Sequence, residues 1–187
     1  MLKAGERQVG EVISKIHVGH VERYKFAAKR VKGFVLDAAC GCGYGSSLLP
    51  GDVTGIDLEP EAIAYAEENY PGPRYLVDNV ATHKGSYDWI VSLETLEHLP
   101  EPEVTLRNFR EMADWLIVST PNQDNYPFKV EQYLGDTFPH LRHYTPSELD
   151  ELLSACGWRS VERFCQVEKT SPVSHGTNGK FIIFLCR

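Results

Sequence analysis

The stretch VLDAACGCGYGSS, residues 35–47, decides the fold, because an apolar run passes directly into a turn of alternating glycines. Gly41, Gly43 and Gly45 occupy every second position, and the residues up to Leu49 leave room for about two helical turns. A buried parallel strand that leads through such a turn into a helix is typical of folds that bind a cofactor at the carboxyl end of a sheet. The stretch therefore predicts the first strand of a parallel sheet and a ligand-binding turn.

Strand-like and helix-like segments alternate along most of the chain. The predicted strands cover residues 34–39, 52–58, 74–78, 87–94 and 114–120, and the predicted helices after the second of them cover 59–70, 102–113 and 145–158. Segments 159–169 and 180–186 are two more strands, and they must pair antiparallel because the loop between them is too short for a crossover helix. We therefore predict an α/β, Rossmann-like, doubly wound fold with a seven-stranded sheet, made of five parallel strands and a C-terminal antiparallel β-hairpin.

The bulk composition narrows the possible partners and compartments. A chain of 187 residues fits a single domain, residues 1–187. Its formal net charge of −7 disfavours nucleic acid and anionic membranes as partners. The sequence has neither the apolar core of a signal peptide nor a stretch long enough for a membrane helix, and its five cysteines have no disulfide-framework spacing. We expect a cytoplasmic enzyme; the sequence leaves its oligomeric state open.

The spacing of the glycine-rich turn separates the possible cofactors. A dinucleotide fingerprint has its last glycine three residues after the second, and here Ser46 occupies that position. A phosphate-binding P-loop ends in Gly-Lys-Ser/Thr, which is absent. No lysine or arginine lies between residues 33 and 73, although a phosphate site would favour one. The turn therefore favours a cofactor without phosphate groups.

Acidic residues follow three successive strands of the predicted sheet. Asp57 ends the second strand, Asp78 the third, and Glu94 follows the fourth. A carboxylate at the position of Asp57 can accept two hydrogen bonds from a ribose diol. Acidic strand ends without a basic residue among them suit a positively charged nucleoside, and S-adenosylmethionine, with its sulfonium, ammonium and ribose, has that chemistry.

Five motifs in order carry a resemblance to a known family. They are VLDAACGCGYG, VTGIDLEPEAIAYAEENY, YLVDNVA, YDWIVSLETLEHL and STPN…HLRHYTPSELDELLSACGW, within residues 22–158. Together they resemble the class I S-adenosylmethionine-dependent methyltransferases, in the branch of the ubiquinone-biosynthesis O-methyltransferases and other small-molecule methyltransferases. The resemblance implies transfer of a methyl group to an oxygen or nitrogen of a small-molecule acceptor, with S-adenosyl-L-homocysteine as the second product.

The resemblance also implies a set of cofactor-binding residues. They are Arg23, Asp37, Ala39, Gly41, Gly43, Asp57, Leu58, Asp78, Asn79, Val80, Ser92 and Leu93. Asp57 would bind the ribose hydroxyls, Asp78 the adenine amino group, and Arg23 the cofactor carboxylate. Ala39 replaces the first glycine of the family loop, and we expect this change to be tolerated if the backbone φ stays negative.

Histidines supply the candidate catalytic residues His98, His140 and His143. His98 can pack beside the cofactor, act as a general base, or share a divalent cation with Glu94 and Glu97, as in some relatives. His140 and His143 precede a helix, where one of them can take a proton from an acceptor hydroxyl or simply end a solvated loop. We assign no metal-binding residue. His83 and His175 indicate only exposed loops, and Cys40 and Cys42 only small loop residues.

Two segments are expected to border the acceptor. We predict an N-terminal helical lid over residues 1–32, divided by Gly19, and a substrate-side loop over residues 121–144.

Two alternative functions stay open. The chain can be a non-catalytic cofactor-binding or scaffold member of the same fold. It can also be a nicotinamide-dependent oxidoreductase, which the glycine spacing and the terminal hairpin disfavour.

Overall fold

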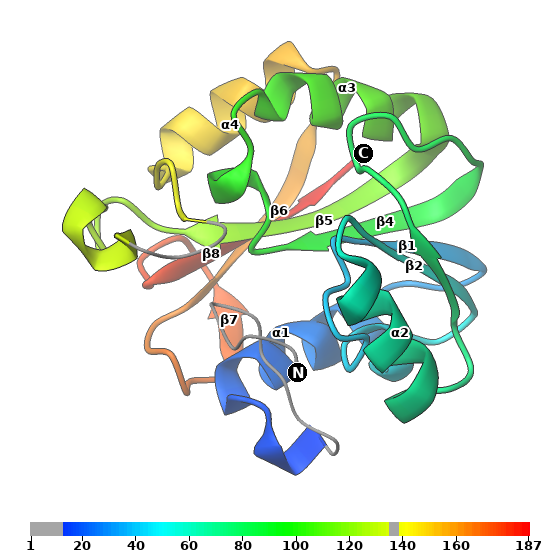
Figure 1. Ribbon diagram of the computed structural model, residues 1–187. Helices are drawn as coiled ribbons and strands as arrows, with labels where there is room; N and C mark the ends of the chain where they lie inside the picture. Colours follow the sequence, from blue (N-terminus) through cyan, green and yellow to red (C-terminus); the bar gives the residue numbers. More distant parts are fainter. Residues whose placement is uncertain (1–12, 135–138) are drawn as a thin grey trace.

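A single mixed β-sheet organises the molecule (Figure 1). The computed structural model describes residues 13–134 and 139–187. The strands are β1 (Phe34–Ala38), β2 (Asp52–Asp57), β3 (Arg74–Val77), β4 (Tyr87–Leu93), β5 (Ala113–Pro121), β6 (Ser160–Gln166), β7 (Val173–His175) and β8 (Phe181–Cys186). Their order in the sheet is β3-β2-β1-β4-β5-β8-β6-β7. The first five are parallel and the other three join antiparallel, as the alternation and the short loop predict.

The prediction of seven strands is wrong by one, because the described residues form eight. The additional strand, β7, lies in the loop between the two predicted C-terminal strands and pairs with Phe164–Gln166 of β6. It has three residues, which is too short for an alternating pattern to be recognised in the sequence. β7 closes part of the sheet edge that β6 would otherwise expose.

Helices cover both faces of the sheet, as a doubly wound fold requires. They are α1 (Val18–Ala28), α2 (Pro60–Asn69), α3 (Pro102–Met112) and α4 (Pro146–Ala155). Figure 1 shows α3 and α4 on one face and α1 and α2 on the other. Leu106 and Phe109 of α3 and Leu149 of α4 are fully buried against the first face. Val21 and Phe26 of α1 belong to the core of the second face.

Local sequence signals explain where the helices begin and end. The Thr145 side chain accepts a hydrogen bond from the Glu148 backbone, and the Glu148 carboxylate accepts one from Thr145 N, which is the predicted capping box of α4. Gly19 lies inside α1, near its start, and does not divide it. The first of the two predicted N-terminal helices falls mainly on residues outside the described ones, and the short turn η1 (Ile13–Lys15) precedes α1.

The connections on the carboxyl side of the sheet are mostly short turns. The predicted helix after the glycine-rich turn is a single 3-10 turn, η2 (Ser46–Leu48), and η3 (Leu96–His98) follows β4. The predicted substrate-side segment contains η4 (Val130–Tyr133), while residues 1–12 and 135–138 of the two predicted border segments lie outside the described residues. Among the described residues, no helix is long and apolar enough to cross a membrane.

Candidate functional site

Asp37 anchors the glycine-rich turn at the end of β1. Its carboxylate is fully buried and accepts hydrogen bonds from the hydroxyls of Tyr24 (3.1 Å) and Ser46 (2.6 Å). Burial raises the pKa of Asp37 to about 7, although both hydrogen bonds act in the opposite direction. Because Tyr24 belongs to α1, this acid joins the N-terminal helix to the turn.

Asp57, at the end of β2, fixes the shape of the same turn. One carboxylate oxygen accepts a hydrogen bond from Gly41 N (2.9 Å) and the other from Glu59 N (3.0 Å). The side chain is buried at the carboxyl edge of the sheet. Asp57 therefore joins the tip of β2 to the glycine-rich turn.

Three residues of the turn have positive φ, and one of them corrects a prediction. Gly41 (φ 56°) and Gly43 (φ 82°) adopt the left-handed conformation that glycine tolerates. Ala39 has φ 63°, so the condition under which we expected alanine to be tolerated here, a negative φ, is not met. A Cβ at Gly43 would lie 2.5 Å from that of Ala66, whereas a Cβ at Gly41 would meet no atom within 4 Å. Gly41 thus faces open space.

The two cysteines of the turn are buried. Cys40 packs with Ile63, Ala66 and Tyr75 in a small apolar cluster, and burial raises the pKa of its thiol. This environment fits the interpretation of Cys40 and Cys42 as small packing residues of the loop.

Asp78 belongs to a partly buried chain of hydrogen bonds that sequence reasoning missed. Its carboxylate lies 2.7 Å from His83 Nδ1 and also accepts a hydrogen bond from Asn79 N (2.7 Å). His83 Nε2 lies 2.8 Å from the hydroxyl of Tyr87. The expectation that His83 marks only an exposed loop is wrong, since its side chain is 5% exposed. The hydrogen bond from His83 is the first cause that lowers the pKa of Asp78.

The remaining predicted cofactor residues follow β2 and β3 or lie at the end of β4. Leu58 is half exposed beside Asp57, whereas Val80 and Leu93 are buried in the two cores. Asn79 uses its Oδ1 to accept a hydrogen bond from Ala81 N, which shapes the turn after β3. Ser92 is fully buried, and its hydroxyl has no hydrogen-bond partner among the described residues.

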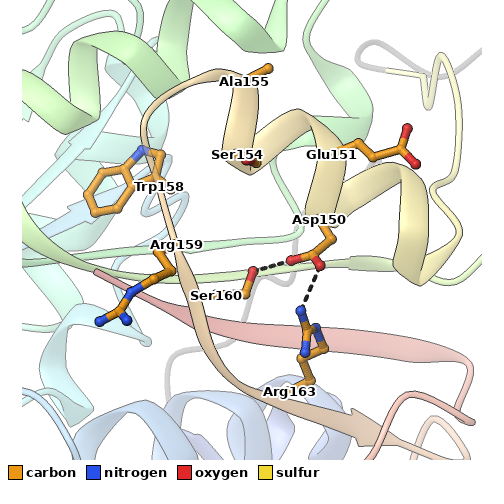
Figure 2. A pocket seen from close by; sticks show the side chains of 8 residues that line it. All are labelled: Asp150, Glu151, Ser154, Ala155, Trp158, Arg159, Ser160 and Arg163. Carbon is orange, nitrogen blue, oxygen red and sulfur yellow. Dashed lines mark hydrogen bonds and ion pairs between the residues drawn. The ribbon is translucent and has the colours of Figure 1, made fainter.

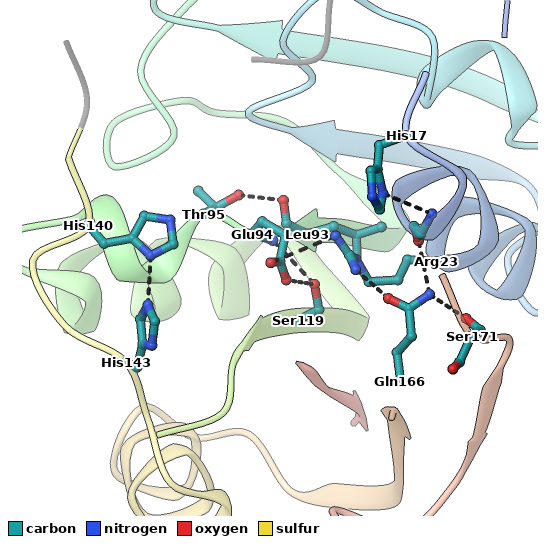
Figure 3. Close-up of polar contacts among 11 residues, drawn as sticks. His17, Arg23, Leu93, Glu94, Thr95, Ser119, His140, His143, Gln166 and Ser171 are labelled. Carbon is teal, nitrogen blue, oxygen red and sulfur yellow. Dashed lines mark hydrogen bonds and ion pairs between the residues drawn. The ribbon is translucent and has the colours of Figure 1, made fainter. Parts of the chain in front are cut away.

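Arg23 and Glu94 form a buried ion pair at the tip of β4 (Figure 3). The guanidinium of Arg23 donates a hydrogen bond to Gln166 Oε1 (2.6 Å) and lies 3.7 Å from Glu94 Oε2. Ser119 donates a hydrogen bond to the other Glu94 oxygen (2.7 Å). Glu94 has φ 54°, a strained conformation for a non-glycine residue. The carboxylate of Glu94 is thus directed towards Arg23 and Ser119.

His140 and His143 form a hydrogen-bonded pair in the segment before α4 (Figure 3). His143 Nδ1 lies 2.6 Å from the carbonyl of Tyr126, and a carbonyl can only accept, so Nδ1 carries a proton. In neutral His143, Nε2 then accepts from His140 Nδ1 (2.8 Å) and from the hydroxyl of Tyr133 (3.1 Å). Neutral His140 consequently carries its lone pair on Nε2.

His98 lies next to this pair. Its ring packs edge-on against His140 with 4.6 Å between centroids, and its Nδ1 is 3.3 Å from the carbonyl of Pro139. One potential ligand atom from each of Glu97, His98 and His140 lies within 4.8 Å of the others. The structure therefore groups Glu97 and His98 with His140, whereas Glu94 is directed to Arg23.

A surface hollow of about 600 Å³ lies elsewhere, between α4 and β6 (Figure 2). In it, Asp150 accepts hydrogen bonds from Ser160 and Arg163. Ser160 pairs through Cys186 with Leu116, near the amino end of β5. Because the glycine-rich turn and the acidic strand ends lie at the opposite, carboxyl edge, we do not assign this hollow to the cofactor.

Comparisons with known proteins identify the family. The strand order and the glycine-rich turn after β1 define a Rossmann-like α/β protein, a class whose members bind their ligands at the carboxyl edge of the sheet. Residues 19–163 match the model of the methyltransferase domain family, and the chain belongs to that family. A ubiquinone biosynthesis O-methyltransferase of Nitrosospira multiformis is 30% identical over 168 residues, which cover 78% of this chain and 69% of that protein.

Solved structures share the same fold. A SAM-dependent methyltransferase from Thermotoga maritima, a possible histamine N-methyltransferase, superposes with a TM-score of 0.74 at 15% identity and covers 90% of each chain. Magnesium protoporphyrin IX methyltransferase from Synechocystis PCC 6803, with bound SAM, gives a TM-score of 0.63 at 19% identity, over 90% of this chain and 76% of that one.

The protein is thus an S-adenosylmethionine-dependent methyltransferase, and the resemblance found in the sequence is confirmed. The cofactor is S-adenosylmethionine, so the alternative of a nicotinamide-dependent oxidoreductase is excluded. The residues present fit it, because Gly41 leaves open space above the turn and Ser92 keeps a buried hydroxyl without a partner in the described structure. Asp57 and Asp78 lie side by side at the carboxyl edge of the sheet, at the ends of β2 and β3.

Proposed function

We propose that this methyltransferase acts on an oxygen or nitrogen of a small-molecule acceptor. The observation that carries the proposal is the pair His140–His143, held by the Tyr126 carbonyl beside η3 at the end of β4. A hydroxyl or protonated amine must lose a proton when it is methylated, and an oriented imidazole can accept that proton. The similarity to a ubiquinone biosynthesis O-methyltransferase supports an oxygen acceptor.

The proposal places the cofactor along the carboxyl edge of β1, β2, β3 and β4. Asp57 would hold the ribose hydroxyls and Asp78 the adenine amino group, while the backbone of the glycine-rich turn would border the methionine part. Arg23 would contribute to binding the cofactor carboxylate, although in this structure its guanidinium is directed to Glu94 and Gln166. Segments 1–32 and 121–144 would enclose the acceptor.

The proposed chemistry assigns a proton acceptor at a defined atom. When bound, S-adenosylmethionine supplies a methyl group already activated by the sulfonium. His140 would take the acceptor proton at Nε2, because its Nδ1 donates to His143. His143 is held in the required tautomer by Tyr126. The buried carboxylate of Glu97, with an oxygen within 4.8 Å of a ring nitrogen of His140, would stabilise the imidazolium that forms.

The net charge and the cysteines support a proposal for the class of acceptor and for the compartment. We propose that the acceptor is neither nucleic acid nor a membrane component, since the net charge of −7 opposes both. All five cysteines are buried and none forms a disulfide, which suits the reducing cytoplasm.

The test replaces His140 with Gln and measures transfer of radiolabelled methyl to panels of phenols, sugars and nucleotides. We expect kcat on a hydroxyl acceptor to fall about 100-fold or more, with unchanged calorimetric affinity for S-adenosyl-L-homocysteine. His175→Gln, at an exposed position on β7, is the matched control and should retain activity. If His140→Gln instead lost affinity for S-adenosyl-L-homocysteine, His140 would belong to the cofactor pocket. Cofactor binding by the wild type without transfer to any panel would favour the non-catalytic alternative.

A further inference from the structure

The turn after β3 returns the chain to Asp78. Thr82 N and His83 N both donate to the carbonyl of Asn79, at 3.0 and 2.8 Å. The ring of His83 lies at the end of β3, with Nδ1 2.7 Å from Asp78 Oδ2. Asp78 is also joined to the neighbouring strand, because its backbone N donates to the carbonyl of Asp57 (3.0 Å). A histidine therefore contacts one of the two acids at the carboxyl edge of the sheet.

Buried contacts fix the position of His83, whose side chain is itself buried. Asn108, on α3, donates through Nδ2 to the carbonyls of Val80 (3.1 Å) and His83 (2.9 Å). Asn108 is buried as well, and its Oδ1 accepts a hydrogen bond from Lys84 Nζ (2.9 Å). The backbone at His83 is therefore held by α3 as well as by its own turn.

The partners of the two ring nitrogens determine the tautomer of His83. The hydrogen bond from His83 is the first cause that lowers the pKa of Asp78, so Asp78 is ionised near pH 7. A carboxylate can only accept, so His83 Nδ1 carries a proton. In neutral His83, Nε2 then accepts from the hydroxyl of Tyr87 (2.8 Å). The chain of hydrogen bonds thus runs in one direction, from Tyr87 through His83 to Asp78.

The carboxylate of Asp78, unlike the ring that donates to it, reaches the surface. Its side chain is 39% exposed, whereas that of His83 is 5% exposed. The bonds from His83 Nδ1 and from Asn79 N (2.7 Å) go to different oxygens, and a carboxylate offers about four acceptor positions. Asp78 can therefore accept a further hydrogen bond from a ligand while both protein donors hold it in place.

A fixed and ionised acceptor distinguishes between donors and acceptors on a ligand. The exocyclic amino group of adenine donates, whereas a 6-oxo group at the same ring position accepts. An oxo group would therefore bring an acceptor against the negative charge of Asp78. Apolar surface is also available at these strand ends, because Leu58, after Asp57, and Val77, before Asp78, are both half exposed. This combination suits an aminopurine better than an oxopurine.

We propose that His83 is the positioning residue on which the preference of this methyltransferase for the adenine base of its cofactor depends. His83 would act through Asp78, by holding the carboxylate in the orientation that accepts from the amino group. The proposal rests on the proposed function, in which Asp78 meets that amino group, and adds the residue that makes the contact selective. A carboxylate already held in place needs no reordering when the ligand binds, so more of the contact energy contributes to selectivity.

The first experiment measures calorimetric affinities for S-adenosyl-L-homocysteine and for S-inosyl-L-homocysteine, whose base carries the 6-oxo group. We expect the wild type to prefer the adenosyl compound about 20-fold or more, and His83→Leu to reduce this preference about fivefold or more. His83→Asn, close to leucine in shape but with an N–H donor at the position of Nδ1, should restore most of the preference. Equal preferences in the wild type and His83→Leu, or equal losses in both variants, would overturn the proposal.

The second experiment determines the tautomer of His83 by ¹⁵N NMR in the cofactor-free protein, with His83→Asn used to assign the ring. We expect Nδ1 to carry a proton at pH 8, as its contact with Asp78 requires. A proton on Nε2 alone would overturn the proposal, because Nδ1 could then not donate to the carboxylate.

Two further variants separate this inference from the proposed function. Asp78→Ala removes the carboxylate and should abolish the preference for the adenosyl compound. His175→Leu, at an exposed position on β7, should keep both affinities. If Asp78→Ala keeps the wild-type preference, the assignment of Asp78 to the amino group fails, and the inference fails with it. If Asp78→Ala loses the preference and His83→Leu keeps it, only the inference about His83 fails.

Discussion

Ala39 adopts a left-handed backbone conformation although it carries a Cβ. A left-handed φ of 63° brings the Cβ of an L-residue too close to the following carbonyl, at a cost of roughly 1–2 kcal/mol. The residue follows β1 at the turn, where the family loop has a glycine. The conformation therefore belongs to the turn, and alanine adopts it under strain.

We predict that Ala39→Gly raises the free energy of unfolding by about 0.5–1 kcal/mol. Glycine relieves the strain but loses part of the gain through its more flexible unfolded state. Urea denaturation measures the change. Ala64→Gly, at an exposed position inside α2, is the matched control and should lower the free energy by about 1 kcal/mol. Equal destabilisation by both changes would show that Ala39 is not strained.

At the scale of elements, the tip of β2 and the glycine-rich turn act as one unit. Asp57 joins them through hydrogen bonds from Gly41 N and Glu59 N. The carboxylate shapes the turn and, in the function we propose, also holds the ribose hydroxyls of the cofactor, so its loss should affect cofactor binding more than it affects the sheet.

We predict that Asp57→Ala weakens binding of S-adenosyl-L-homocysteine about 100-fold or more. The change removes a carboxylate from backbone donors and from the proposed ribose contact, and hydrogen bonds to charged groups contribute about 1.5–3 kcal/mol each. Isothermal calorimetry gives the affinity, and thermal unfolding shows that the fold persists. Asp52→Ala, at the exposed start of the same strand, should bind normally. Unchanged affinity in Asp57→Ala would exclude Asp57 from the site.

The elements that the sequence predicts well are those with strong local signals. The capping box at Thr145 and the proline at the start of α2 and α3 locate helices, and apolar runs locate the parallel strands. β7 is missed because three residues show no period. The burial of His83 is missed because it depends on Asp78 and Tyr87, which the chain brings together only through β3 and β4.

In the candidate site, too, local features can be predicted from the sequence and tertiary contacts cannot. Acids at strand ends and alternating glycines are visible in the sequence because position along a strand fixes the edge where they lie. The pairing of His140 with His143 and the ion pair of Arg23 with Glu94 depend on tertiary contacts between distant segments. The sequence indicated these residues as candidates, but it could not predict which of them contact one another.

At the scale of the whole molecule, burial of Asp37 makes stability depend on pH. The pKa of this acid is about 7 in the folded state and near 3.8 when exposed, so the folded state binds the proton more strongly. The contribution is fully present below about pH 3.8 and is lost as pH rises through about 7. The whole fold should therefore lose stability across this window through one buried group.

We predict that Asp37→Asn weakens this dependence. Between pH 5 and pH 8, the free energy of unfolding of the wild type should fall relative to the variant by on the order of 2–3 kcal/mol. Chemical denaturation of the cofactor-free proteins at several pH values measures the difference, and the other titrating groups change equally in both. Parallel pH profiles would contradict an elevated pKa at Asp37.

The sheet order has a consequence for how the chain is made. β8 comes after β6 and β7 in the sequence, yet it lies between β5 and β6. A nascent chain leaving the ribosome therefore carries β6 and β7 before the strand that connects them to the rest exists. Until residues 181–186 emerge, β5 keeps an open edge that can pair with other polypeptides.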